Sequence, residues 1–425
     1  MKNTILFTVT VLLVCCMYAC NKGAVPASET EDIQTKEEIQ PENEIEPAKL
    51  IELTTKQGEK AATDNRFALK MFKEVSGEPN TFFSPLSLNL AIGMLYNGAS
   101  GDTRAEMGEV LGLGDLSVVE INEYYQKMSQ ALLNIDPLTQ IGIANSIWYR
   151  NGFPVKQPFI DMNHEYFDAE VSEIDFDKPD AADIINDWCA EKTNDKIKEI
   201  VHAPISPYIM MYLINALYFK STWKFEFDKK ETKQDDFTKV GNQKKKVNMM
   251  EQTKTLPYYA NDYLQCVEMP YGNEAFSMVA ILPADGTDID QIIDYLDDSK
   301  WQNVVSNLYP QKIWLKFPRF KIECDIPLNV PVMKVGMKRI FSGGFENISD
   351  VALAVSNIKQ KTFVEVNEEG TEAAAVTVIV MFTTSAGPDP QPVPFFANRP
   401  FLYLIKEKST GVILFIGRMD DPIEE

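Results

Sequence analysis

The side chains that usually carry out enzyme chemistry are scarce in this sequence. It contains only two histidines, His164 and His202, and neither lies near a nucleophile motif of a serine or cysteine hydrolase. The GxSxG, HExxH and P-loop patterns are absent, and Gly112 and Gly114 lack the third glycine that a dinucleotide-binding turn requires. The sequence therefore argues against a hydrolase, a histidine-rich metal site and a nucleotide-dependent enzyme, and it predicts no cofactor and no metal.

Residues 363–387 offer a different chemistry, because their pattern predicts a segment able to enter a β-sheet. Residues 373–382 are all small, β-branched or apolar. On alternate positions one face of this segment is uncharged, whereas Glu372 falls on the other face. The uncharged face is formed by Thr371, Ala373, Ala375, Thr377, Ile379 and Met381.

Small side chains set this segment apart from an ordinary internal strand, which would fit the same alternation. Alanine is a weak strand former, yet residues 373–375 are all alanine. Small residues suit a strand that must slide between two existing strands, because bulky side chains would obstruct its entry. Gly370 permits a hinge at the start of the segment.

The elements that must position this segment predict an α+β fold in one large domain. Apolar spacing predicts helices at 64–74, 85–98, 103–111 and 180–198, with Ser84 as the N-cap of the second. Strands are predicted at 141–149, 210–219, 276–282, 313–322, 363–367, 401–406 and 412–418. Helices come mainly first and strands mainly later, without βαβ alternation, which is typical of the α+β class.

Six motifs resemble the signatures of the serpin family, and they lie in the family's order over about residues 60–422. Residues 83–87 resemble its FSPxS helix start, and 215–223 its NALYFKxxW strand; residues 317–320 match its FPRF strand. Residues 398–401 and 411–418 match its C-terminal signatures. The family's hinge is matched by Glu368, Glu369, Gly370, Thr371, Glu372, Ala373, Ala374 and Ala375.

The resemblance implies a fold and a mechanism. Helices mainly from the N-terminal half would pack on a large mixed central sheet, with further antiparallel sheets and an exposed reactive-centre loop at about residues 370–394. The protein would be a monomeric suicide-substrate inhibitor whose cleaved loop inserts into the central sheet and traps a serine protease as a covalent acyl-enzyme. A papain-like cysteine protease is a second candidate partner. The alternative is a non-inhibitory member that acts as a surface binding or carrier protein.

The same resemblance assigns residues to the region where the central sheet opens. Ser84, Ser87 and Asn215 match positions that hydrogen-bond beneath the sheet, and Trp223 matches the point where the loop enters it. The family usually has a histidine facing this cluster, whereas counting back from the hinge places Gln360 there. An amide can donate and accept hydrogen bonds but does not titrate, so pH-dependent gating at this site is not expected.

Family spacing places the scissile bond between Thr384 and Ser385. The segment up to residue 401 is longer than in many members, so Met381, Phe382 and Thr383 are alternative positions. No lysine or arginine occurs between residues 370 and 399, which disfavours a trypsin-like target. Thr384, Met381 or Val380 suits a small elastase-like pocket, and Phe382 suits a chymotrypsin- or subtilisin-like pocket.

The N-terminal residues resemble a bacterial lipoprotein leader. Residues 1–19 predict a signal peptide, and the small residue before Cys20 resembles a cleavage site that leaves Cys20 lipidated. An ordinary cleaved signal, with Cys20 incidental, is the alternative. Residues 20–59 predict an acidic disordered tether, and 60–425 the folded domain. Together they predict an exported protein held at the outer membrane or cell surface.

The net charge excludes two classes of partner, and the cysteines of the folded part argue against disulfide bonds. The formal net charge of −21 argues against nucleic acid and against direct binding to an anionic membrane. Outside the leader lie Cys189, Cys266 and Cys324, which are widely spaced and odd in number. We therefore expect buried free thiols and no disulfide framework.

Overall fold

The computed structural model describes residues 46–77, 79–371 and 391–424. Cys20 and the rest of the leader lie outside the described residues. So do the later hinge positions and every candidate for the scissile bond, namely Glu372, Ala373, Ala374, Ala375, Met381, Phe382, Thr383, Thr384 and Ser385. No helix among the described residues combines the length and apolar character needed to cross a membrane.

The first helix, α1 (Thr55–Val75), begins earlier than the predicted start at residue 64. Thr54 and Gln57 form a capping box that fixes its N-terminus. Lys60 is 1% exposed and forms an ion pair with Asp64 inside the fold. The start of the folded part at residue 60 was therefore placed too late, because the polar first turns of α1 have the composition of a tether.

Helix α2 (Pro85–Gly98) begins as predicted, with the Ser84 hydroxyl accepting a hydrogen bond from the Ser87 amide. It is buried on nearly all sides, which fits a helix that is apolar around its whole circumference. The other helices are α3 (Gly101–Val110), α4 (Val118–Asn134), α5 (Gln157–Phe167), α6 (Ala181–Lys192), α7 (Ile289–Tyr295), α8 (Asp298–Ser306) and α9 (Asn329–Lys334).

Helix α6 ends at Lys192, short of the predicted end at residue 198. Asn194 and Asp195 have φ angles of 48° and 61°, and two successive left-handed residues cannot continue a right-handed helix. Thr193 closes the last turn by donating its hydroxyl to the Cys189 carbonyl over 2.7 Å. Apolar spacing alone does not reveal this stop.

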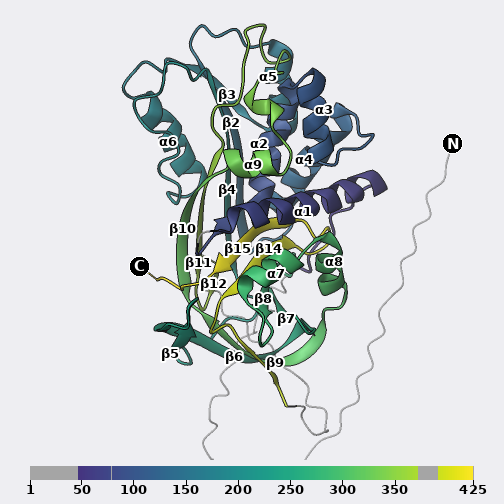
Figure 1. Ribbon diagram of the computed structural model, residues 1–425, viewed down its shortest axis with the longest axis vertical. Helices are drawn as coiled ribbons and strands as arrows, with labels where there is room; N and C mark the ends of the chain where they lie inside the picture. The colour runs from purple at the N-terminus through teal and green to yellow at the C-terminus, as the bar shows by residue number, and fades with distance from the viewer. Residues whose placement is uncertain (1–45, 78, 372–390, 425) are drawn as a thin grey trace, which may run out of the picture. The chain divides into compact units, whose positions relative to one another are not determined.

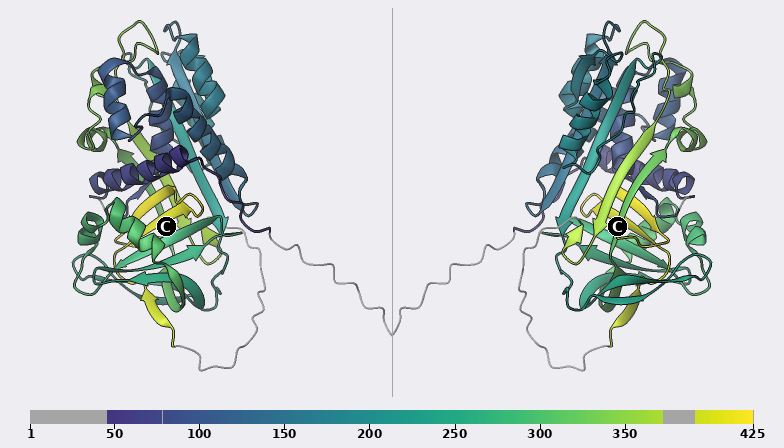
Figure 2. Two further views of the ribbon diagram at one scale, coloured as in Figure 1. Left: turned by 90° about the vertical axis from the view of Figure 1, so that its right-hand side faces the viewer. Right: turned by 90° about the vertical axis from the view of Figure 1, so that its left-hand side faces the viewer.

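One sheet holds the hinge. Its strands lie in the order β10 (Phe320–Pro327), β11 (Lys359–Val366), β12 (Gly370–Thr371), β4 (Met211–Thr222), β2 (Thr139–Arg150) and β3 (Glu170–Ile174). β12 is antiparallel to both β11 and β4, so β11 and β4 run parallel to each other. Side views show the long strands of this sheet running from the helix-rich end toward the second sheet (Figure 2).

The second sheet supplies most of the core. Its order is β1 (Phe82–Phe83), β15 (Ile413–Met419), β14 (Phe401–Glu407), β8 (Phe276–Pro283), β7 (Leu264–Pro270), β6 (Lys244–Ala260), β9 (Tyr309–Pro318) and β13 (Val393–Phe396), with β5 (Lys233–Thr238) paired to β6. Every residue of β8, β14 and β15 is buried.

The two sheets divide the strand predicted at 313–322. β9 belongs to the second sheet and β10 to the first, and the chain turns between them at Arg319. Pro318 has no amide hydrogen to continue a ladder, and the Arg319 amide donates to the Asn248 carbonyl over 2.9 Å. The apolar alternation changes phase at this point, from residues 313, 315 and 317 to residues 320 and 322, and the prediction of a single strand overlooked that signal.

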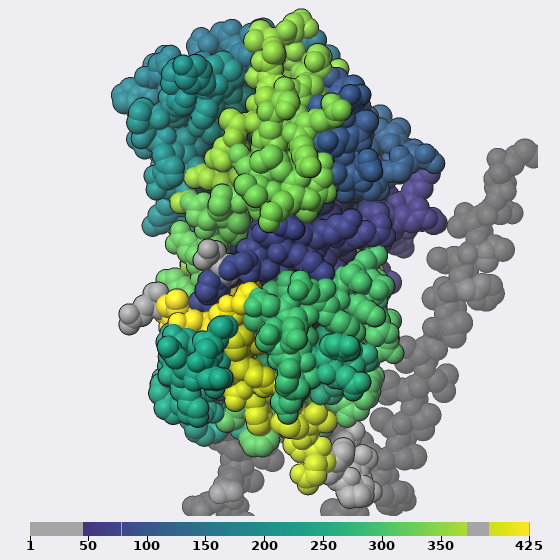
Figure 3. Space-filling model, in the orientation of Figure 1, coloured from purple at the N-terminus to yellow at the C-terminus, as the bar shows by residue number. Residues whose placement is uncertain are grey.

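Helices α2, α3, α4 and α5 gather at one end of the described part, and strands β5 to β9 lie at the other (Figure 1). Helix α1 crosses the surface between these two ends (Figure 3). The structure confirms the predicted α+β class, with a mixed sheet in which β2 and β3 are parallel and the other neighbours are antiparallel.

Candidate functional site

The candidate site is a tight turn at residues 367–371, here called the hinge turn. The Asn367 side-chain oxygen accepts hydrogen bonds from the Glu369 and Gly370 amides at 3.0 and 3.3 Å. The Asn367 amide donates to the Gly370 carbonyl over 3.0 Å. Asparagine favours such turns because its short side chain satisfies nearby amides. The turn directs β12 back between β11 and β4.

Gly370 is required by the close approach of β12 to β4. Its φ angle is +155°, and a Cβ atom at this position would lie 2.1 Å from the Ser221 carbonyl oxygen and 2.7 Å from the Thr222 Cα. Any larger residue would push the turn away from β4. The hinge glycine predicted from the sequence therefore serves for close packing as well as for backbone freedom.

Thr371 is held by an aromatic pair beneath the turn. Its hydroxyl lies 2.6 Å from the Tyr271 hydroxyl, and the Trp223 and Tyr271 rings stack with centroids 4.4 Å apart. The Trp223 indole also donates to the Asn367 carbonyl over 2.9 Å. Burial raises the pKa of Tyr271 well above its usual range, so this hydroxyl stays protonated at neutral pH.

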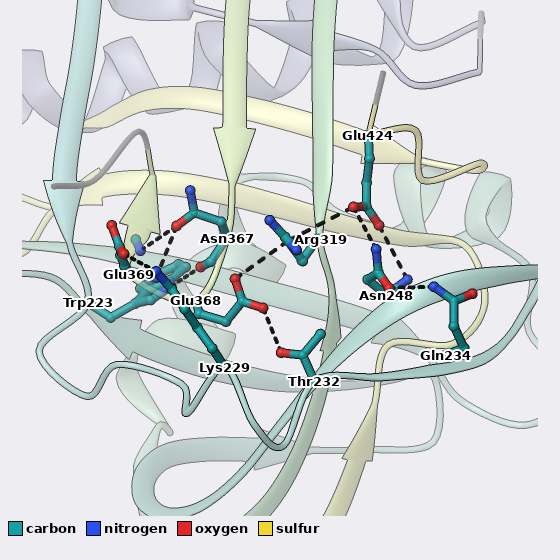
Figure 4. Close-up of polar contacts among 11 residues, drawn as sticks. Trp223, Lys229, Thr232, Gln234, Asn248, Arg319, Asn367, Glu368, Glu369 and Glu424 are labelled. Carbon is teal, nitrogen blue, oxygen red and sulfur yellow. Dashed lines mark hydrogen bonds and ion pairs between the residues drawn. The ribbon is translucent and has the colours of Figure 1, made fainter. Parts of the chain in front are cut away.

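Two glutamates fix the outer side of the hinge turn (Figure 4). The Glu368 side chain is only 4% exposed; it accepts a hydrogen bond from the Thr232 hydroxyl at 2.6 Å and lies 3.5 Å from Arg319 Nε. The Glu369 carboxylate forms an ion pair with Lys229. A carboxylate removed from water needs such partners, and losing one would leave its charge uncompensated.

Backbone hydrogen bonds tie the same two glutamates to the segment after β4. The Trp223 amide donates to the Glu369 carbonyl over 2.8 Å, and the Phe227 amide donates to the Glu368 carbonyl over 2.9 Å. The hinge turn is therefore joined to β4 and its continuation by main-chain as well as side-chain contacts.

A second cluster lies where the start of α2 meets β11 and β4. The Ser84 amide donates to Gln360 Oε1 over 2.7 Å, and Gln360 Nε2 donates to the Ser84 carbonyl over 2.8 Å. Ser87 donates its hydroxyl to the Asn215 carbonyl at 3.5 Å, and Asn215 Nδ2 donates to Asn145 Oδ1 over 2.7 Å. Through this cluster α2 contacts both β11 and β4, the strands that flank β12.

The structure thus brings the predicted residues together in two groups. Ser84, Ser87, Asn215 and Gln360 form one group, and Trp223, Glu368, Glu369, Gly370 and Thr371 form the other. Sequence reasoning missed Thr232, Tyr271 and Arg319. Arg319 belonged to a recognised motif, but a motif does not say which carboxylate its arginine will face.

The contacts of the site hold a short strand in position. Among the described residues, no group of histidine, cysteine, aspartate or glutamate side chains is arranged to hold a metal ion. The contacts hold the start of one strand between two others, and within the described residues β11 and β4 are joined through β12. The arrangement therefore leaves Thr371 as the last described residue of a short strand held between β11 and β4.

Comparison with known proteins identifies one family. Residues 62–422 match the family model described as Serpin (serine protease inhibitor). Iripin-2 of Ixodes ricinus is 33% identical over 367 residues, which cover 84% of this chain and 92% of the relative. Serpin I2 of Homo sapiens is 31% identical over 374 residues, covering 85% and 91%.

A solved structure agrees with the sequence relatives. The native state of the thermophilic serpin Tengpin superposes with a TM-score of 0.79 at 31% identity, covering 89% of this chain and 97% of that one.

Proposed function

The chain belongs to the serpin family, and on that basis we propose that it inhibits serine proteases as a suicide substrate. The loop that begins after Thr371 is offered to the protease as a substrate. After cleavage it extends β12 into the sheet between β11 and β4. The protease is carried along before its acyl-enzyme can be hydrolysed. The inhibitor works as a monomer.

One observation carries this proposal: β12 already lies between β11 and β4. Gly370 pairs with Thr222, and Thr371 pairs with Val366 and Ser221. Starting a new strand costs conformational entropy, because a turn must close before ladder hydrogen bonds can form. Here the turn is closed before any cleavage, so insertion is an extension of a strand that has already started.

Residues 373–382 fit this extension, since they are small, β-branched or apolar.

The rate of insertion matters because the acyl-enzyme has a limited lifetime. The serine oxygen of the protease attacks the carbonyl of the residue before the scissile bond, and the amine of the next residue leaves with a proton. The loop is then joined to the protease by an ester. Insertion must distort the protease before water attacks that ester.

The target is an elastase-like or a chymotrypsin- or subtilisin-like protease. Because no lysine or arginine lies between residues 370 and 399, a trypsin-like pocket would have no cation to pair with its buried carboxylate. The bond between Thr384 and Ser385 is our first candidate, followed by those at Met381, Phe382 and Thr383. A papain-like cysteine protease could be trapped in the same way, through a thioester.

The direct test mixes the purified chain, from Asn21 onward, with pancreatic elastase, chymotrypsin and trypsin. A band at the summed mass that survives boiling in SDS supports covalent trapping, and the mass of the released C-terminal peptide identifies the bond. Cleavage without such a band, together with unchanged heat stability of the cut protein, contradicts insertion. The protein would then be a non-inhibitory member that acts as a surface binding or carrier protein.

We further propose that Cys20 is lipidated and that the protein is displayed at the outer membrane or cell surface. The support is the leader sequence, in which an apolar run ends in a small residue before Cys20. Replacing Cys20 with alanine, or treating cells with globomycin, should release the protein from the membrane fraction. Membrane association that both treatments leave unaltered would refute the lipid anchor.

A further inference from the structure

The segment that follows β15, residues 420–424, ends beside Arg319, the residue that faces Glu368 of the hinge turn. We call it the strap. At its start, the Asp420 and Asp421 amides donate to Asn80 Oδ1 at 2.9 and 2.8 Å, and Asp421 forms ion pairs with Lys239 and Lys245 at 3.1 and 2.8 Å. The strap is therefore fixed in place well before it reaches Glu424.

At its far end the strap meets the edge of the hinge-bearing sheet. The Lys321 amide of β10 donates to the Ile423 carbonyl over 2.6 Å. The Glu424 carboxylate accepts hydrogen bonds from the Asn248 amide at 3.3 Å and from Asn248 Nδ2 at 2.8 Å. These contacts leave the carboxylate beside Arg319, whose Nε lies 4.0 Å from Glu424 Oε2.

Arg319 lies between two carboxylates, as Figure 4 shows: Glu368 of the hinge turn at 3.5 Å and Glu424 of the strap at 4.0 Å. Its side chain is 39% exposed, so each ion pair is weak by itself and the two must act together. In the observed position the guanidinium is attracted by a carboxylate on each side. A rotamer that points into solvent would give up both attractions. Glu424 therefore favours the arginine rotamer that serves Glu368.

We propose that Glu424 is a positioning residue for loop insertion: it holds Arg319 against Glu368 and so keeps the hinge turn docked between β11 and β4. The path runs from the strap, through Arg319 at the junction of β9 and β10, to the first residues of the inserting strand. The effect on protease trapping rests on the proposed function, whereas the effect on the hinge turn does not.

The decisive variant is Glu424→Gln, which keeps an oxygen for one of the two Asn248 hydrogen bonds and removes the charge that faces Arg319. Its matched control is Glu323→Gln, which removes one negative charge from an exposed position of β10 and leaves the ion pairs that fix the strap intact. The first readout needs no protease. Hydrogen exchange of the Trp223 and Phe227 amides, which donate to the hinge turn, should accelerate about two- to five-fold in Glu424→Gln only.

The second readout is the amount of inhibitor consumed per molecule of elastase trapped. We expect Glu424→Gln to increase the ratio of cleaved to trapped inhibitor by about two- to five-fold. A double-mutant cycle with Arg319→Gln separates positioning from general loosening, because Glu424→Gln should have little further effect once the arginine is gone.

The outcomes distinguish the two proposals. Unchanged exchange in Glu424→Gln, or equal acceleration in Glu323→Gln, overturns the positioning role. Additive effects of Glu424→Gln and Arg319→Gln also overturn it. Accelerated exchange that is specific to Glu424→Gln supports it, even if the unmodified protein traps no protease. A failure of the unmodified protein to trap any protease would overturn only the proposed inhibition.

Discussion

Replacing Gly370 with alanine should convert the protein from an inhibitor into a substrate. The added Cβ would lie 2.1 Å from the Ser221 carbonyl oxygen, whereas carbon and oxygen normally approach no closer than about 3.3 Å. The turn must therefore move by roughly an ångström, which disrupts the pairing of Gly370 and Thr371 with β4.

The expected magnitude follows from the backbone as well as from the contact. A φ angle of +155° is costly for a residue with a side chain, by about 1–3 kcal/mol. That cost lowers the population of the docked hinge turn by about five- to 150-fold. Since insertion extends the docked turn, the fraction of elastase trapped should fall and the fraction of loop cleaved without trapping should rise.

The assay titrates elastase with the variant and counts inhibitor consumed per enzyme molecule inhibited. Gly343→Ala is the matched control, because Gly343 also has a positive φ, +133°, but its added Cβ would approach only the Leu353 carbonyl, at 3.6 Å. The docked turn does not nucleate insertion if Gly370→Ala consumes no more inhibitor per trapped elastase molecule than the unmodified protein and shows the same hydrogen exchange at the Trp223 amide. That result would refute our reasoning.

Three further results are expected. Gln360→Ala should lower the free energy of unfolding by roughly 1–3 kcal/mol for each Ser84 backbone group left buried and unpaired, and an unchanged urea midpoint would contradict this. The pKa of Glu120 should be about 2 by NMR titration, because a hydrogen bond from Lys56 lowers it first and Ser117 helps. Since this folded-state value lies below the ordinary 4.5, the contribution to stability is present above pH 4.5 and is lost as pH falls toward 2; Lys56→Met should raise the pKa. Burial raises the pKa of Cys189 to about 12, so this thiol should react with a disulfide reagent only after unfolding, and rapid reaction in the native protein would refute its burial.

The start of α2 and the strand β8 could be predicted from the sequence, because each depends on residues that are close together in the chain. Ser84 caps α2 because the hydroxyl of a serine before the first helical turn can accept a hydrogen bond from an amide three residues later, here that of Ser87. β8 occupies residues 276–283, close to the predicted 276–282, because its apolar run is buried throughout. The end of α6 was wrong, since left-handed residues at 194 and 195 leave no mark in the apolar spacing.

Contacts between distant segments could not be predicted from the residues alone. Arg319 and Glu368 meet only because β10 pairs with β11, which places residue 320 opposite residue 366. The apolar alternation changes phase at residues 318 and 319, which marks a break, but the assignment of the two halves to different sheets depends on the partners of each strand. Family resemblance supplied Trp223 and Gln360 as site residues, and the structure supplies the partners that hold them.

The loop segment is anchored at both ends, in different sheets. Residue 371 pairs with β11 and β4, whereas residue 393 begins β13, which pairs with β9. As long as the chain between them is intact, β12 can lengthen only as far as that span permits. Hydrolysis of one bond between these residues removes the restriction permanently, and no concentration of a reversible ligand can restore it. Under the proposed function, each molecule would therefore respond to a single catalytic event rather than to a binding equilibrium, and the protein would be consumed in proportion to the protease it meets.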